Sequence, residues 1–122
     1  MKFVREPQSA VTIRHVEKGK IRVGEQIVTE NVLLFRDSVR HVPVVGYGDE
    51  LTEEDLADLI EAEPEIILFG TGWQSRLPPR ELVFALARRG IGFETMDTPA
   101  ACRTYNILVS EDRDVAAVLL ID

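Results

Sequence analysis

Two short stretches hold the residues whose side chains are best suited to binding or chemistry. The candidate ligand-binding residues are Gly70, Thr71, Gly72, Gln74 and Arg76 in the first stretch, and Asp97, Thr98, Cys102 and Arg103 in the second. Backbone N–H groups of a glycine turn can bind an anion, aspartate can act as a base or hold a ligand hydroxyl, and arginine can bind carboxylate or phosphate through two hydrogen bonds. These stretches predict a small-molecule or anion site if they meet in space.

Each group also has a structural interpretation. The glycines of the turn can be present because the backbone there adopts positive φ angles, which glycine allows. The turn also departs from a dinucleotide-binding fingerprint, which would need a glycine where the chain has Ser75. Asp97 or Thr98 can cap a helix, while Arg103 can pair with an acid. Both interpretations of the two stretches stay open at this point.

Cys102 is the single cysteine, and Arg103 follows it directly. A helix start and a neighbouring cation both stabilise a thiolate, which suggests a redox-responsive thiol. A nucleophile would also need a base, and the only histidines, His15 and His41, fall in the N-terminal half. Lone cysteines are usually buried. We therefore favour a packing role, and the histidines lack the spacing of metal ligands.

Trp73 lies between the glycine turn and Arg76. Tryptophan and arginine are frequent anchors of protein interfaces, so Trp73 is a candidate interface residue. The alternative is that its ring folds back over the core.

Composition narrows the classes of function. The 122 residues carry 14 basic and 21 acidic side chains, a net charge of −7. This charge argues against general binding to nucleic acid or anionic membrane. One cysteine rules out an internal disulfide and suits a reducing compartment. With no signal-peptide pattern and no apolar run of about 20 residues, we expect a cytoplasmic protein without membrane insertion, cofactor or metal.

The N-terminal half has the two-residue periodicity of β structure. After a loose arm at residues 1–10, alternating residues from 10 to 45 predict an antiparallel meander with one dry face. We expect residues 36–38 to form a turn. Pro43 places the last piece, residues 39–45, at an edge or bend.

The second half alternates between helical and strand patterns. We expect a helix opened by Thr52 and ended by Pro64, a strand at 65–69, a helix from Pro78-Pro79 to Gly90, a strand at 93–96, a helix capped by Asp97 or Thr98, and a strand at 115–121. The last strand is apolar without alternation, so it should be interior to the sheet. Ligands in parallel α/β sheets bind beyond the carboxyl ends of strands, which is where both stretches should lie.

Three stretches resemble a known family: LFGTG at 68–72, GIGFETMDT at 90–98 and AACRTYN at 100–106. This is a family of small α/β domains of unknown function in bacteria, archaea and mitochondria. It includes a mitochondrial assembly factor for respiratory complex I and the adipogenesis-associated domain protein. The resemblance spans nearly the whole chain and implies a three-layer fold with a central mixed sheet and a small antiparallel β layer. The length of the chain predicts a single domain, 1–122. The family's usual glycine after the third helix is here Asp112, which tolerates left-handed angles.

The leading hypothesis is a non-catalytic domain that binds an unidentified protein partner in assembly or scaffolding. It depends on the resemblance. It also depends on the sequence offering no recognisable combination of a nucleophile, a general base and a residue that orients the base. The competing hypothesis is a binder of a small molecule or anion, or an enzyme, with its site between residues 70–76 and 97–103.

Overall fold

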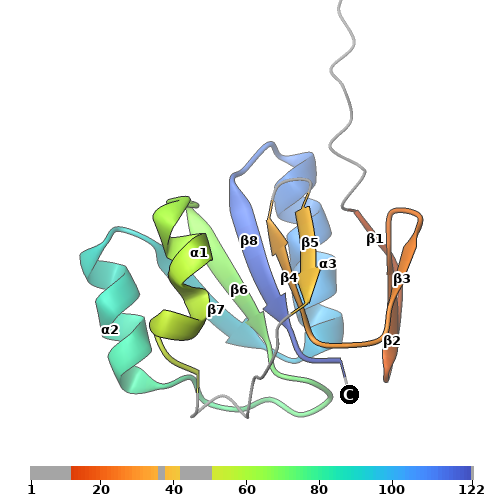
Figure 1. Ribbon diagram of the computed structural model, residues 1–122, viewed down its shortest axis with the longest axis horizontal. Helices are drawn as coiled ribbons and strands as arrows, with labels where there is room; N and C mark the ends of the chain where they lie inside the picture. The colour runs from red at the N-terminus through yellow and green to blue at the C-terminus, as the bar shows by residue number, and fades with distance from the viewer. Residues whose placement is uncertain (1–11, 36–37, 42–50, 122) are drawn as a thin grey trace, which may run out of the picture.

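The computed structural model describes residues 12–35, 38–41 and 51–121 (Figure 1). Its elements are, in chain order, β1 (Ile13–Glu17), β2 (Lys20–Val23), β3 (Gln26–Val28), β4 (Val32–Phe35), β5 (Ser38–His41), the 3-10 helix η3 (Glu54–Leu56), α1 (Ala57–Glu61), β6 (Ile66–Gly70), α2 (Arg80–Arg88), β7 (Gly92–Met96), α3 (Thr98–Ser110) and β8 (Val115–Leu119).

Five strands form the central sheet in the order β5-β4-β8-β6-β7. β8 is antiparallel to β4 and parallel to β6, and β6 is parallel to β7. Every residue of β8 is buried. The interior position predicted for the last strand is confirmed, because a strand covered on both faces needs apolar residues at every position.

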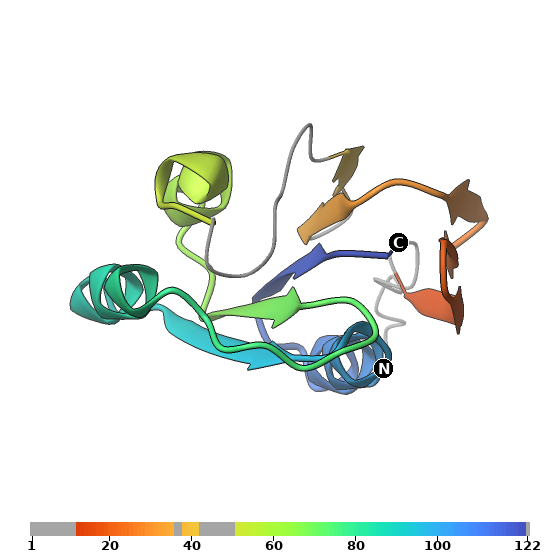
Figure 2. The same ribbon diagram turned by 90° about the horizontal axis from the view of Figure 1, so that it is seen from below.

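The central sheet is the middle of three layers (Figures 1 and 2). On one face, Ile67 and Phe69 of β6 pack with the buried leucines of α1 and α2. On the other face, Leu68 of the same strand packs with α3 and with the small sheet of β1, β2 and β3. Successive residues of a strand point to opposite faces, so one apolar strand serves both cores. The predicted α/β class, with helices on both faces and a small antiparallel β layer, is confirmed.

The N-terminal β structure is divided between two sheets, so the single meander predicted for residues 10–45 is wrong. Only β1, β2 and β3 form the antiparallel small sheet. β4 pairs with β8, and β5 pairs with β4 at the edge of the central sheet. The two-residue period shows that a strand is half-buried but does not identify the sheet that it joins.

The edge position predicted for residues 39–45 is confirmed as far as His41. Ser38, expected in a turn, is the first residue of β5. The predicted loose arm at 1–10 and the rest of the predicted turn and edge piece, residues 36–37 and 42–45, lie outside the described residues.

Most helix ends follow the predicted signals. The Asp55 amide donates to Thr52 Oγ1 at 3.3 Å, while the Thr52 amide donates to Asp55 Oδ2 at 3.0 Å. These reciprocal bonds satisfy donors at the start of η3. Gly90 and Asp112, which follow α2 and α3, have φ angles of +78° and +66°. Both therefore adopt the left-handed conformation expected after a helix.

Gly70, the last residue of β6, approaches the start of α3 closely. A Cβ atom added to Gly70 would lie 2.9 Å from Thr98 Oγ1 and 3.1 Å from Thr98 Cα. We expect Gly70→Ala to lower the free energy of unfolding by about 1–3 kcal/mol, because backbone and side chain must both shift. Urea unfolding followed by circular dichroism measures the change.

Gly92→Ala is the matched control at the start of the neighbouring strand. Its added Cβ would meet Ile66 Cγ1 at 3.4 Å, an ordinary contact. We expect a change below about 1 kcal/mol. Equal stability of the two variants would contradict the close approach inferred at Gly70.

Candidate functional site

The two stretches singled out in the sequence meet at one rim of the central sheet. The Thr71 amide donates to the Met96 carbonyl at 2.9 Å, and the Thr98 amide donates to the Gly72 carbonyl at 2.7 Å. They meet because β6 and β7 are parallel neighbours whose carboxyl ends share an edge. The geometric condition for a shared site is therefore met.

Thr98 is the central residue of this rim. Its hydroxyl donates to the Leu120 carbonyl at 2.6 Å and accepts from the Gly72 amide at 2.8 Å. The Leu120 amide in turn donates to the Gly70 carbonyl at 2.9 Å. Thr98 is fully buried. We call Gly70, Gly72, Thr98 and Leu120 the Thr98 junction, since one hydroxyl there links the chain that follows β6 to the chain that follows β8.

The turn after β6 uses its own polar groups. Thr71 is buried, and its hydroxyl donates to the Gln74 carbonyl at 2.6 Å. The amides of Thr71 and Gly72 both donate within the protein, as given above, so neither is free to bind an anion. Gly72 has a φ angle of +92°. These facts support the structural interpretation of the glycine turn. The predicted anion site would lack two of its N–H donors, because both are used within the protein.

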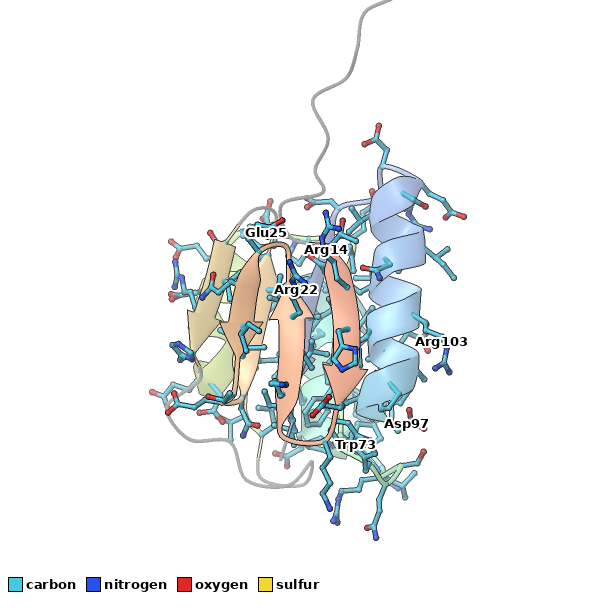
Figure 3. The ribbon with its side chains drawn as sticks, turned by 90° about the vertical axis from the view of Figure 1, so that its right-hand side faces the viewer. Arg14, Arg22, Glu25, Trp73, Asp97 and Arg103 are labelled. Atoms are coloured by element: carbon cyan, nitrogen blue, oxygen red, sulfur yellow. The ribbon has the colours of Figure 1, made fainter. Side chains whose placement is uncertain are left out.

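Asp97 caps α3, which was the structural alternative for this residue. Its Oδ1 accepts from the Ala100 amide at 2.8 Å, and Pro99 follows in the first turn. Arg103 is exposed on α3 and has no ion pair within residues 12–35, 38–41 and 51–121. Figure 3 shows Arg103 pointing into solvent, away from the small sheet. Asp97 therefore caps the helix that carries Arg103, while the Arg103 side chain points into solvent.

Trp73 is half-buried beside the N-terminal end of α3 (Figure 3). Its side chain packs against the core between α3 and the small sheet, so the ring partly covers the core, as the alternative interpretation held. The next residues are exposed. Arg76 donates to Gln74 Oε1 at 3.3 Å, and Leu77 is 86% exposed. We call residues 73–77 the rim loop.

Leu77 is a candidate that the sequence analysis did not single out. A signal was present, because this apolar residue stands between Arg76 and Pro78 and belongs to neither flanking strand nor helix. Large exposed apolar side chains are informative when they gather with interface-type residues such as tryptophan and arginine.

Cys102 is buried in α3 with 2% of its surface exposed. Burial raises the pKa of its thiol to about 12, and the neighbouring Arg103 offsets this rise only in part. The thiol is therefore protonated at neutral pH, which supports the packing role and opposes a reactive thiolate.

Asn106 has a long-range role that the sequence analysis did not foresee. Its Oδ1 accepts from the Ile13 amide at 2.9 Å, and its Nδ2 donates to the Ile13 carbonyl at 2.8 Å. The side chain thus pairs with β1 as a neighbouring strand would, and joins α3 to the small sheet. Beside it, Tyr105 is fully buried, and burial raises the pKa of its hydroxyl.

Other features lie away from the rim. His15 and His41 are exposed and approach Glu17 and Glu30 at 2.7 and 3.4 Å. The described residues hold no group of three or more histidine, cysteine, aspartate or glutamate side chains arranged for a metal ion.

A pocket of about 40 Å³ lies among β4, β5 and α1, lined by Leu33, Phe35, Ser38, Arg40, Asp58 and Leu59. None of the described helices has the length and apolar character needed to cross a bilayer.

Comparison with known proteins matches the chain to one family. The model of a family described as "Protein of unknown function (DUF498/DUF598)" matches residues 13–120. A Mus musculus protein named NADH dehydrogenase (ubiquinone) 1 alpha subcomplex assembly factor 3 is 32% identical over 93% of this chain. This chain covers 62% of that protein, less than two thirds of its length.

Two further relatives cover nearly the whole chain. A Francisella tularensis protein named "13 kDa major membrane protein" is 29% identical over 93% of each chain. The NMR structure of a Xanthomonas campestris protein matches with a TM-score of 0.82 and 32% identity, over 99% of this chain and 92% of that one. These findings confirm the resemblance inferred from the sequence and the fold class.

Removing the Thr98 hydroxyl should weaken the fold. Thr98→Val keeps the shape but leaves the Gly72 amide and the Leu120 carbonyl without this partner. We expect the free energy of unfolding to fall by about 2–6 kcal/mol, since each of the two unsatisfied buried groups costs about 1–3 kcal/mol. Thr98→Ser keeps the hydroxyl and should lose only about 1 kcal/mol. Urea unfolding compares the two variants, and a valine variant as stable as the serine variant would contradict the role of the hydroxyl.

The Cys102 thiol should react slowly while the protein is folded. At pH 8 we expect its reaction with a disulfide reagent such as DTNB to be roughly a hundredfold or more slower than in urea, because burial keeps it protonated. Since the pKa is raised from 9.0 to about 12 on folding, the thiol favours the folded state below pH 9 and loses this contribution as the pH rises toward 12. Cys102→Ala removes that pH dependence. Rapid labelling of the folded protein at pH 8 would refute this prediction.

Proposed function

The chain belongs to the family of proteins of unknown function designated DUF498/DUF598, and on that premise we propose that it is a non-catalytic protein-binding domain that acts in the assembly of a larger complex. The family includes proteins named as assembly factors, and the mouse relative aligns over 93% of this chain. That alignment covers nearly all of the two cores and the rim. The relative's name refers to the assembly of a respiratory enzyme. For this chain we propose a protein partner without identifying it.

The rim loop is the observation that carries the proposal. Leu77 is the most exposed large apolar side chain in the described part of the protein. Trp73 and Arg76 accompany it in the same loop, and their residue types are those enriched at binding hot spots. Binding of a partner that removes an apolar side chain from water lowers the free energy of the complex.

The Thr98 junction makes this loop suitable for recognition. It anchors the start of the loop through buried hydrogen bonds, among them the 2.8 Å bond from the Gly72 amide to Thr98 Oγ1. A loop that is already ordered loses less conformational entropy on binding than a mobile one. We infer that the rim loop presents Leu77 and Arg76 to a protein partner from a preorganised base.

For the location we propose the cytoplasm, because Cys102 is a free thiol and suits a reducing compartment. The name of the Francisella tularensis relative makes a place at a membrane the alternative. Fractionation of cells that express the tagged chain distinguishes the two locations.

A second candidate function is the binding of a small anion at the same rim. Its support is that residues 70–76 and 97–103 are joined by main-chain hydrogen bonds and contribute exposed cations. Arg76 and Arg103 would supply the charge, with Gln74 beside them. Of the other predicted ligand-binding residues, Gly70, Thr71, Gly72, Asp97, Thr98 and Cys102 are buried or use polar groups within the protein, so their part in such a site would be to position the two arginines.

Affinity capture from native lysate with matched variants tests the leading proposal. Leu77→Glu should abolish capture of a specific protein, because a buried carboxylate at the contact opposes binding. Ile107→Glu is the control, since Ile107 is a large apolar residue on α3 that is also exposed, to 56%. Both variants should unfold at the wild-type temperature. Equal capture by wild type and Leu77→Glu would refute binding through the rim loop.

The same preparations test the second candidate. Metabolites that co-purify with wild type are compared with those of Arg103→Ala, and phosphate and citrate are titrated against both proteins by calorimetry. Anion binding at the rim requires heat with wild type that falls at least about tenfold in affinity with Arg103→Ala, as expected for a charge-assisted contact. Identical titrations would exclude Arg103 from such a site.

A further inference from the structure

Two neighbouring surfaces of the protein carry opposite charge. Residues 51–65, which hold η3 and α1, include seven acids and no lysine or arginine: Glu53, Glu54, Asp55, Asp58, Glu61, Glu63 and Glu65. Residues 74–90, which hold α2, include four arginines and one acid: Arg76, Arg80, Arg88, Arg89 and Glu81. Both surfaces cover the same face of the central sheet, at the end away from the small sheet (Figures 1 and 2). We call them the acidic and basic helix surfaces.

Some of these charges are neutralised within the protein. Arg89 Nη2 lies 3.0 Å from Glu53 Oε2 and links the two surfaces directly. Arg40 and Arg113, from outside both surfaces, pair with Asp58 and Glu65 at 2.6 and 2.7 Å. Seven charged side chains of the two surfaces have no ion pair in the described part of the chain: Arg80, Arg88 and Glu81 on the basic helix surface, and Glu54, Asp55, Glu61 and Glu63 on the acidic helix surface.

The spacing of the two arginines without an ion pair matches that of Glu54 and Glu61, two of the acids without one. Arg80 and Arg88 are eight residues apart on α2, a rise of about 12 Å. Glu54 and Glu61 are seven residues apart across η3 and α1, also a rise of about 12 Å. The two pairs therefore span similar lengths, and the acidic pair is divided between η3 and α1, which join at Leu56 with non-helical φ and ψ angles of −106° and 15°.

The side chains between the charges are also complementary. Phe84 lies four residues from each free arginine, on the same side of α2, and is 56% exposed. Between the two glutamates the exposed side of α1 begins with Ala57, which is small. A small residue permits close approach of a helix, and a phenyl ring can pack there with its flanking charges paired.

Local helix stability does not account for two of these charges. Arg80 is the first residue of α2, and Glu61 is the last residue of α1. The helix dipole favours acids at the start of a helix and bases at its end, the reverse of these positions. A partner that supplies the opposite charge would stabilise both residues.

We propose that these surfaces bind a second copy of this chain in a two-fold symmetric dimer. In it, the basic helix surface of each copy lies on the acidic helix surface of the other. A two-fold axis brings a patch onto itself, so a patch with adjacent basic and acidic halves satisfies both halves at once. An acidic partner of another kind would pair with Arg80 and Arg88 but leave Glu54 and Glu61 unpaired, which is why the second copy is favoured.

Analytical ultracentrifugation tests the dimer with variants that reverse each charge set. The basic-surface variant is Arg80→Glu with Arg88→Glu, and the acidic-surface variant is Glu54→Lys with Glu61→Lys. We expect wild type to dimerise at low salt and to dissociate as sodium chloride is raised, because the contacts are solvent-exposed ion pairs. Each variant alone should dimerise at least about tenfold more weakly, since four pairs become repulsive.

An equimolar mixture of the two variants is the decisive measurement. In a mixed dimer both contacts regain opposite charges, so the affinity should return to within about threefold of wild type. Lys18→Glu with Glu111→Lys, in the exposed turn between β1 and β2 and just after α3, is the control and should dimerise as wild type does. Phe84→Ser should weaken the dimer without changing any charge, and it provides a test that does not depend on the four reversals.

Three results would overturn the dimer. They are a wild-type protein that stays monomeric up to about 1 mM at low salt, reversed variants that dimerise as wild type does, and a mixture that does not recover. None of these results bears on the rim loop, because Leu77→Glu is measured by capture of a different protein.

Discussion

The structure depends on one buried hydroxyl, that of Thr98. It accepts from the Gly72 amide and donates to the Leu120 carbonyl, two main-chain groups that no regular strand pairing would satisfy once β6 and β8 have ended. Buried polar groups without partners are costly, so the end of the sheet requires a small residue with both a donor and an acceptor at this position. The absence of a side chain at Gly70 is part of the same arrangement, because it lets the helix start approach the strand.

The hydrogen bonds that make the rim rigid also reduce what it can bind. The amides of Thr71 and Gly72, the hydroxyl of Thr98 and one oxygen of Asp97 are used within the protein. What remains outward is a set of side chains on a fixed loop, which is the kind of surface that recognises another protein. In a preorganised loop, the conformational entropy is lost when the protein folds, so less is lost when a partner binds. The assembly factors in the family are consistent with such a use of the fold.

The overall net charge conceals how the charges are distributed. Acids gather on η3 and α1 while arginines gather on α2, and these elements pack side by side over one core. Exposed charges interact weakly in water unless several act together over a defined surface. The separation of charge therefore contributes little to the stability of the fold. Its larger effect is expected at an interface, where several ion pairs can form together. The rim loop and the two helix surfaces give one small domain two separate faces with different chemistry.

The sequence by itself determined the α/β class, the helix starts near Thr52, Pro78-Pro79 and Asp97-Thr98, and the interior position of β8, because these follow from local patterns of apolar residues, proline and caps. Only the tertiary structure decided which sheet β4 and β5 join, and that Asn106 binds Ile13, 93 residues away. It also decided that Thr98 serves Leu120 rather than a ligand. Periodicity records whether a residue is buried but not its neighbour, and a hydrogen-bond partner distant in the chain is set by packing alone.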